Sequence, residues 1–180
     1  MQTFKETQRF GVKWAWAVII AIFALFLYAI VQQVILGKPF GTKPTSNNIL
    51  LTLSLIPLLL LLFMRSIKLK TCYSSIGIQY QFYPFQFKST TIEWNQINDA
   101  YLREYNSFFE YGGWGIRYGT PKTGKAINTS QSGKIGLQLQ FKNENLLLLG
   151  TKNPEKIQEI LKQYFKHFKA KSLIMHLSCL

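Results

Sequence analysis

Two uninterrupted apolar runs dominate the first part of the chain. The first extends from Trp14 to Leu36 and the second from Ile49 to Met64, and neither contains a charged side chain. About 18 apolar residues at a rise of about 1.5 Å give roughly 27 Å of helix, close to the thickness of a hydrocarbon core. The pattern therefore predicts a transmembrane helical hairpin, because helices satisfy their own backbone hydrogen bonds in lipid. The predicted helices cover 14–36 and 49–66, with an external loop at 37–48.

Two alternatives to membrane spans fit this pattern less well. A buried helix of a soluble protein keeps a polar face, and the first run has none between Trp14 and Val31. A cleaved signal peptide has a shorter apolar region followed by a small-residue cleavage site, and no such site follows Leu36.

Basic residues near the ends of the two runs set the expected orientation. Three precede the first run, two lie in the loop, and three follow the second run: Lys5, Arg9, Lys13, Lys38, Lys43, Arg65, Lys68 and Lys70. This bias places both termini in the cytoplasm. Residues 1–13 are then a short cytoplasmic lead-in, which we expect to be frayed.

Beyond Lys70 the hydrophobic period changes to two, which is typical of half-buried strands. The predicted strands are Ile76–Phe82, Phe85–Trp94, Ala100–Tyr105, Gly113–Tyr118, Ala126–Asn128 and Ile135–Phe141. Four leucines at 146–149 predict a returning strand that is either buried on both faces or in contact with another surface. Asn153 and Pro154 then suit the start of a helix, whose apolar stripe runs from Ile157 to Phe168.

About seven strands followed by one helix predict an α+β fold for 67–168. The expected architecture is a transmembrane hairpin followed by an antiparallel sheet or barrel that one C-terminal helix caps. Pleckstrin-homology-like (PH-like) domains have this order of elements, which is an analogy at the level of the fold. The tail 169–180 is basic and then apolar, and it could extend the helix, lie on the membrane surface, or be disordered.

The formal net charge of +13 allows three interpretations. Attraction of a cytoplasmic face to anionic lipid is the simplest of them. Nucleic-acid binding lacks a dense Lys/Arg run or a recognisable module, and plain solubility is the remaining interpretation. Cys72 and Cys179 are predicted to be free thiols, because they lie far apart at the ends of a domain expected in the cytoplasm. Neither belongs to a C-x-x-C pair, so the sequence indicates no metal site.

Residues for catalysis are few. The histidines are His167 and His176, the single aspartate is Asp99, and no nucleophile–base arrangement can be argued from their spacing. The segment from Gly119 to Ala126 matches a phosphate-binding loop except that Ala126 stands where Mg²⁺ binding needs a hydroxyl, and a strand-like segment follows it. We therefore expect no enzyme activity, no cofactor, no metal site and no nucleotide or nucleic-acid partner.

The string EYGGWGIR, from Glu110 to Arg117, resembles the signature of a family of small, uncharacterised bacterial membrane proteins with two spans and a PH-like domain. Other similar segments are Gly77–Tyr80, Ile92–Ile97, Arg103–Tyr105, Gly136–Leu139 and Leu149–Thr151. Ile127 and Lys152 depart from the family pattern, which has Tyr and Gln there. The resemblance implies a fold and a location in the bacterial inner membrane, and it implies no catalytic residues.

The EYGGWGIR string also supplies the candidate binding site. Its glycines could serve only a bulge, a positive φ or a close passage of Trp114 over the sheet. Alternatively they could floor a shallow groove with aromatic walls and arginine donors for a carboxylate or phosphate. Glu110 could pair with one of the arginines and so occupy it. The candidate residues are Arg103, Tyr111, Gly112, Gly113, Trp114, Gly115 and Arg117.

The predicted function is a membrane-anchored, PH-like interaction module. It would bind a protein or peptide partner, another copy of the chain, or anionic lipid headgroups at the cytoplasmic membrane face. The alternative is a structural subunit of a larger membrane complex, in which the leucine run at 146–149 and the tail form the interface.

Overall fold

The computed structural model describes residues 3–130 and 132–164. The chain divides into two compact units. The helical unit is Val12–Ser66, and the sheet unit combines the residues up to Gly11 with those from Ile67 onward.

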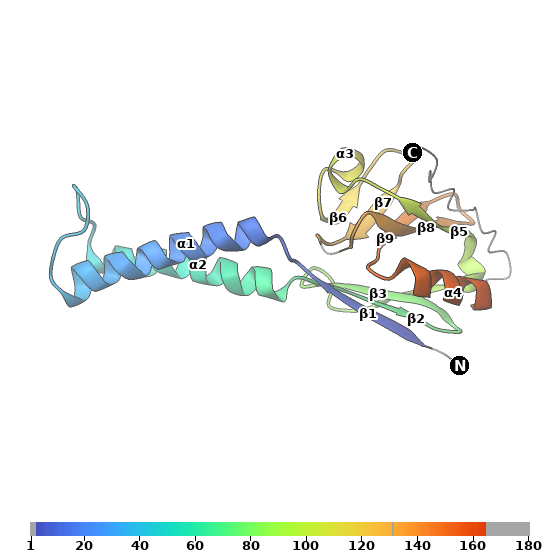
Figure 1. The fold of residues 1–180 in the computed structure, drawn as a ribbon, viewed down its shortest axis with the longest axis horizontal. Helices are drawn as coiled ribbons and strands as arrows, with labels where there is room; N and C mark the ends of the chain where they lie inside the picture. The colour runs from blue at the N-terminus through green and yellow to red at the C-terminus, as the bar shows by residue number, and fades with distance from the viewer. Residues whose placement is uncertain (1–2, 131, 165–180) are drawn as a thin grey trace, which may run out of the picture. The chain divides into compact units, whose positions relative to one another are not determined.

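The helical unit is a hairpin of two long apolar helices. Helix α1 (Lys13–Ile30) continues into one π-helical turn, η1 (Val31–Ile35), and α2 (Asn47–Ser66) returns beside it (Figure 1). The two helical segments are 23 and 20 residues long and apolar enough to cross a membrane, as the sequence predicts. Between them, the Gln33 amide donates to the Thr45 carbonyl at 2.6 Å and to Asn47 Oδ1 at 2.9 Å, which closes the connection with polar groups.

The first sheet of the sheet unit is antiparallel. Its order is β1 (Phe4–Arg9), β2 (Lys68–Tyr73), β3 (Gly77–Tyr83) and β4 (Thr90–Glu93). Strand β1 pairs with β2 along its whole length, from Phe4 opposite Tyr73 to Arg9 opposite Lys68. The expectation of a frayed lead-in is therefore wrong, because the segment before the first helix is an edge strand.

Two polar side chains explain why β1 belongs to the sheet unit. Gln8 is fully buried, and its amide donates to the Gly150 carbonyl at 2.7 Å while its oxygen accepts from Ser132 Oγ at 2.5 Å. The buried Glu6 carboxylate accepts from Thr151 Oγ1 at 2.8 Å and from the Lys152 N–H at 2.7 Å. Polar side chains at the buried positions gave this strand no hydrophobic alternation, so the sequence did not reveal it.

The second sheet is mixed. Its order is β5 (Ile97–Glu104), β8 (Ile135–Phe141), β9 (Leu146–Gly150), β7 (Lys125–Asn128) and β6 (Gly115–Tyr118). All neighbours are antiparallel except β7 and β9, which run parallel, so the expectation of an antiparallel sheet is wrong for this pair. The described part of the unit also contains three short helical elements: η2 (Trp94–Gln96), α3 (Ser107–Tyr111) and α4 (Pro154–Tyr164).

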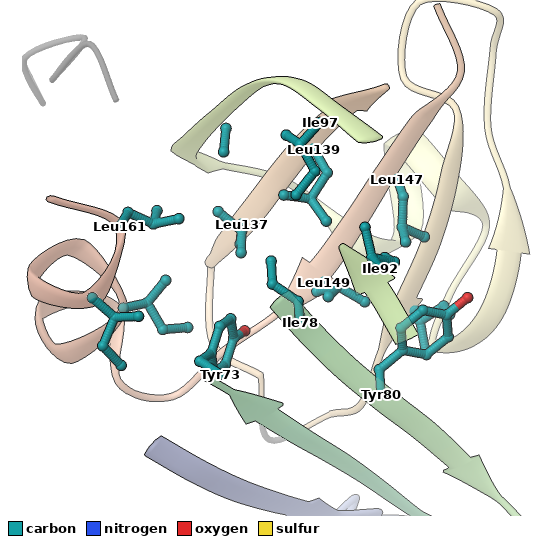
Figure 2. Close-up of a cluster of buried hydrophobic side chains, with 14 of the residues drawn as sticks. Tyr73, Ile78, Tyr80, Ile92, Ile97, Leu137, Leu139, Leu147, Leu149 and Leu161 are labelled. Atoms are coloured by element: carbon teal, nitrogen blue, oxygen red, sulfur yellow. The ribbon is translucent and has the colours of Figure 1, made fainter. Parts of the chain in front are cut away.

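The two sheets share one hydrophobic core. Figure 1 shows them one above the other with α4 alongside, and Figure 2 shows side chains from both sheets and from α4 meeting between them. Ile78 of the first sheet, Leu137 and Leu149 of the second, and Leu161 of α4 are all fully buried there. The one-sided stripe on α4 is thus confirmed for its described residues, while Phe165, Phe168 and the tail 169–180 lie outside them.

The α+β class is confirmed, with local differences in the strands. The expected strand Phe85–Trp94 is shortened to β4, because a turn follows Pro84 and occupies the residues up to Ser89. The expected strand from Gly113 starts only at Gly115, after the helix α3, which the sequence did not predict. The leucine run at 146–149 is buried in this unit from Leu147 onward, on both faces of β9.

Candidate functional site

The EYGGWGIR string lies where α3 ends and β6 begins. Asn106 caps the start of α3, since its Oδ1 accepts from the Phe108 and Phe109 N–H groups at 3.0 and 3.1 Å. Gly112 ends the helix with a φ of +68°, and Gly115 opens β6 with a φ of +108°. A Cβ at either position would meet no atom within 4 Å, so these glycines serve backbone conformation and not close packing.

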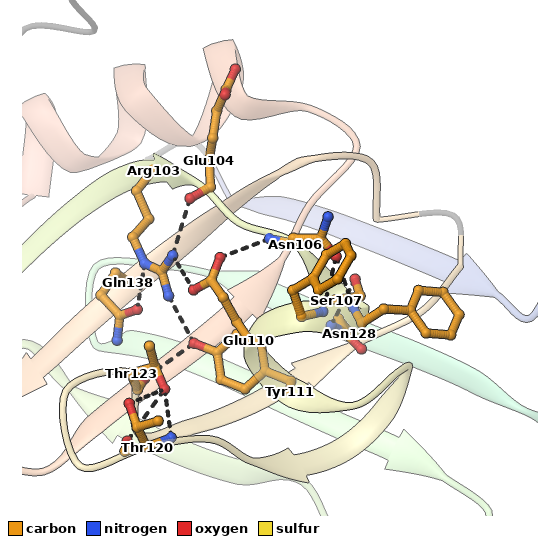
Figure 3. A network of polar contacts seen from close by, with 12 residues as sticks. Arg103, Glu104, Asn106, Ser107, Glu110, Tyr111, Thr120, Thr123, Asn128 and Gln138 are labelled. Atoms are coloured by element: carbon orange, nitrogen blue, oxygen red, sulfur yellow. Dashed lines mark hydrogen bonds and ion pairs between the residues drawn. The ribbon is translucent and has the colours of Figure 1, made fainter.

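Arg103 is held in place by neighbours on three sides (Figure 3). Its Nη1 lies 2.7 Å from Glu110 Oε2 in an ion pair, and also donates to the Glu104 carbonyl at 3.0 Å. Its Nε donates to Gln138 Oε1 at 2.9 Å. The guanidinium thus ties β5 to β8 and to α3, which agrees with the interpretation that Glu110 occupies an arginine.

Tyr111 belongs to the same structural cluster. Its hydroxyl accepts from Arg103 Nη2 at 2.8 Å and donates to the Thr123 carbonyl at 3.1 Å (Figure 3). Its ring is buried with Tyr105, at a centroid distance of 6.3 Å, on the face of the second sheet that α3 covers. Burial raises the pKa of the Tyr111 hydroxyl, so it stays protonated at neutral pH. Neither Tyr111 nor Arg103 is available as the wall or donor of a groove.

The second half of the string lines a cavity of about 320 Å³. Trp114, Gly115 and Arg117 contribute to it, as the sequence predicts for a groove, whereas Arg103, Tyr111, Gly112 and Gly113 do not. The remaining lining residues are Phe10, Ile67, Phe82, Phe85, Ile116, Asn128 and Thr129.

The wall of this cavity is mainly aromatic. The Trp114 ring packs edge-on against Phe108 at a centroid distance of 4.7 Å and against Phe10 at 6.1 Å. Across the cavity, Phe85 stacks on Phe82 at 5.7 Å. These contacts hold the half-buried indole in one orientation, so the space beside it is formed before any ligand arrives.

Polar groups at the cavity are few. Asn128 is fully buried, and both of its side-chain polar atoms form hydrogen bonds within the protein. Its Oδ1 accepts from the Gly115 N–H at 3.1 Å, and its Nδ2 donates to Ser107 Oγ at 3.3 Å. Arg117 is exposed, and its Nε donates to the Trp114 carbonyl at 3.1 Å. Within the described residues, no hydrogen bond involves its two terminal nitrogens. The cavity therefore offers apolar walls and one accessible guanidinium.

Sequence reasoning missed most of this cavity. Phe10 and Ile67 flank the predicted spans, where apolar residues read as extensions of the helices. Phe82 lies on a strand whose inward face was predicted, but no local pattern shows that it would meet Trp114. The pairing of β1 with β2 brings the two flanking segments together, and the backbone hydrogen bond from Phe10 to Ile67, at 3.2 Å, extends this pairing to the cavity residues.

The near-match to a phosphate-binding loop forms a tight turn between β6 and β7. Thr123 Oγ1 accepts from the Thr120 N–H at 2.8 Å inside the turn, and Lys125 starts strand β7 directly after it. The structure thus agrees with the strand that the sequence predicts there. Within residues 3–130 and 132–164, no group of three or more metal-ligating side chains is found.

Comparison with known proteins adds no relative. Neither a protein-family model nor a curated protein matches this chain.

Proposed function

We propose that this protein is a membrane-anchored, non-catalytic interaction module with a PH-like sheet unit. Two sheets on one core with a C-terminal helix alongside support the PH-like assignment, as does the resemblance in the EYGGWGIR string. The hairpin α1–α2 supplies the anchor, and its length and exposed apolar side chains support a membrane location.

Strand pairing supports the proposed topology. Strand β1 precedes α1, β2 follows α2, and the two strands pair along their whole length. A hairpin that crosses the membrane twice therefore returns the chain to the side from which it started. The basic residues that flank the hairpin favour the cytoplasmic face of a bacterial inner membrane for this side.

The partner proposed here is a peptide segment of another protein. Strand β6 is an edge of the second sheet among the described strands, and an edge strand directs unpaired backbone groups outward. A peptide strand added to β6 would place an apolar side chain in the cavity beside Trp114. An acidic side chain or carboxyl terminus of the peptide would meet the terminal nitrogens of Arg117. The observation that carries this proposal is that Gly115, Ile116 and Arg117 form the edge strand and line the cavity at once.

The test is photo-crosslinking in the native membrane. A photoreactive amino acid replaces Tyr118, an exposed residue of β6, in the intact protein. We expect a discrete adduct that is lost in the Trp114→Ala and Arg117→Ala backgrounds. Arg117→Lys keeps the charge but removes the planar fork, so the adduct should weaken and not vanish.

Lys122→Ala, which removes a cation from the exposed turn after β6, is the matched control and should leave the adduct unchanged. An adduct that persists in both alanine backgrounds, while both proteins keep their thermal stability, would falsify the peptide site.

The alternative of a structural subunit loses one of its two supports. The leucine run expected as an interface is buried within the sheet unit, at Leu147, Leu148 and Leu149. The other support, the tail 169–180, lies outside the described residues. An adduct between two copies of this chain would favour self-association over a different partner.

A further inference from the structure

One end of the sheet unit carries the connections to the helical unit. In the first sheet Arg9 lies opposite Lys68, and Lys68 lies opposite Tyr83. The end of β1, the start of β2 and the end of β3 therefore lie together at one end of the unit, which we call the connection end. The turn from Pro84 to Ser89 leaves the sheet at this end.

Four phenylalanines are exposed around the connection end. Phe87 and Phe109 are 78% and 92% exposed, and Phe85 and Phe108 are more than half exposed. Phe85 and Phe87 belong to the turn after β3, and Phe108 and Phe109 to α3. Trp114 links α3 to this end, since its ring contacts both Phe108 and Phe10.

This clustering is not a general property of the unit's surface. Among its described residues, the other large apolar side chains that are exposed are Ile76 and Tyr118. Ile76 lies in the turn between β2 and β3, which is the opposite end of the first sheet. Soluble surfaces rarely gather exposed aromatic rings in this way, so a concentration at one end indicates a contact surface.

Charges near the connection end have one predominant sign. Lys68, Lys88 and Arg117 lie on the segments that carry or adjoin the phenylalanines, and the turn from Pro84 to Ser89 contains no acidic residue. Glu110 of α3 is neutralised by Arg103 at 2.7 Å. Aromatic rings beside basic side chains are the combination that suits the headgroup layer of a bilayer.

Chain connectivity supplies the occupant. Phe10 precedes Lys13, the first residue of α1, by three positions, and Ile67 directly follows Ser66, the last residue of α2. An extended chain covers at most about 3.6 Å per residue, so the cavity residue Phe10 lies within about 11 Å of α1. If the hairpin crosses a bilayer, its covalent connection to Phe10 and Ile67 brings that bilayer close to the connection end. No feature of the chain brings a protein partner there in the same way.

We infer that the connection end is a membrane-contacting surface, in which Phe85, Phe87, Phe108 and Phe109 insert into the headgroup layer. Insertion would fix the orientation of the sheet unit on the membrane, in addition to the covalent tether. The inference rests on the membrane-anchoring part of the proposed function, but not on the peptide site at β6.

The experiment measures lipid contact in the full-length protein in nanodiscs. In a background with Cys72→Ser and Cys179→Ser, single cysteines at positions 87, 109 and 76 carry an environment-sensitive fluorophore. We expect emission at positions 87 and 109 to shift to shorter wavelength and to be lost when lipids carry a shallow quencher. Position 76, which is also exposed but lies at the other end of the sheet, should show no shift and should respond only to an aqueous quencher.

Equal responses at the three positions would overturn the inference. Probes at 87 and 109 that are shielded from both quenchers would also overturn it, because a second protein copy and not lipid would then cover these positions. Failure of the anchoring itself has a separate signature. If alkaline carbonate releases the unlabelled protein from membranes, the hairpin is not a span and the proposed function fails with it.

Discussion

At the scale of single residues, two arginines of the candidate site have opposite roles. Arg103 makes an ion pair and further hydrogen bonds within the sheet unit, whereas Arg117 is exposed and, among the described residues, donates to the Trp114 carbonyl alone. The sequence places both in the candidate site, because it shows that an arginine is present but not which acceptors already surround it. Of the two, Arg117 has terminal nitrogens that make no hydrogen bond with the described residues.

The first prediction separates these roles by stability. Arg103→Ala should lower the free energy of unfolding by about 2–3 kcal/mol, since it leaves Glu110, Gln138 and Tyr111 without their donor. Arg117→Ala should stay within about 0.5 kcal/mol of the parent protein. Thermal unfolding of the detergent-solubilised variants measures both. Similar losses for the two variants would contradict the assignment of Arg103 as structural.

The second prediction concerns a buried hydroxyl. The Tyr73 ring is fully buried, and its hydroxyl makes no hydrogen bond with the described residues. Tyr73→Phe should therefore change the free energy of unfolding at pH 7 by less than about 1 kcal/mol. Burial, assisted by the negative charge of Glu6, raises the pKa of Tyr73 above its ordinary value of 10.0.

The same shift fixes the sign of the pH dependence. Above pH 10.0 the unfolded chain releases this proton before the folded one does, so the contribution of Tyr73 to the free energy of unfolding is constant below that pH and falls above it. Tyr73→Phe should make the alkaline fall shallower, by up to about 1.4 kcal/mol per pH unit. Denaturant titrations between neutral and alkaline pH test this, and identical alkaline slopes would refute it. Burial also raises the pKa values of Tyr105 and Tyr111. These two tyrosines contribute to the alkaline fall in the same way in the parent protein and in Tyr73→Phe.

At the scale of elements, β1 connects parts of the sheet unit that are far apart in the chain. It is attached through buried polar groups to segments that are more than 100 residues away in the chain. Such attachments cost stability when one partner is removed, because the other is left buried and unsatisfied.

The third prediction tests this attachment. Gln8→Ala should lower the free energy of unfolding by about 2–4 kcal/mol, since the Gly150 carbonyl and the Ser132 hydroxyl lose their partner. Thr7→Ala, on the exposed face of the same strand, is the matched control and should change it by less than about 0.5 kcal/mol. Chemical denaturation measures the pair, and equal effects would mean that the buried network adds nothing.

The fourth prediction concerns the end of α3. Gly112→Ala should cost about 1–2 kcal/mol through the left-handed conformation alone, because a Cβ there meets no atom within 4 Å. Gly112→Asn should cost less, since asparagine tolerates this conformation. If thermal unfolding shows the asparagine variant to be the less stable of the two, close packing and not backbone conformation would explain the glycine.

An element could be predicted from the sequence only where its own residues form a recognisable hydrophobic pattern. The two helices and β8 have strong apolar patterns, and the sequence predicts them nearly to their ends. Strands β1 and β2 could not be found in the same way, because both bury polar side chains: Glu6 and Gln8 in β1, and Thr71 between Leu69 and Tyr73 in β2. The short helix α3 depends on one capping asparagine and one terminal glycine, which are signals too common to use alone.

At the scale of the whole molecule, the sheet unit is discontinuous in the chain, since β1 and the rest are separated by the helical unit. The candidate cavity inherits this property. Its lining residues come from both sides of the hairpin, at Phe10 and at Ile67 onward, so no single stretch of sequence contains it. That is why sequence reasoning recovered the motif around Trp114 but not the walls opposite it.

The fifth prediction follows from this discontinuity. Replacing Val12–Ser66 by a turn of about two residues should give a folded sheet unit, because the Phe10 N–H and the Ile67 carbonyl already lie 3.2 Å apart. A fragment that starts at Ile67 should not fold cooperatively, since it lacks β1 and removes the partners Glu6 and Gln8 from the Thr151 hydroxyl and the Gly150 carbonyl. Hydrogen exchange in mild detergent distinguishes the two. Equal protection in both constructions would show that β1 is dispensable.

The position of β1 ahead of the hairpin also dictates an order of events during translation. Gln8 leaves the ribosome well before Gly150, its partner 142 positions later, has been made. At about 5–20 residues per second, β1 is synthesised roughly 7–28 s before that partner, and both apolar helices emerge in the interval. The sheet unit consequently closes only after the helical unit has been synthesised.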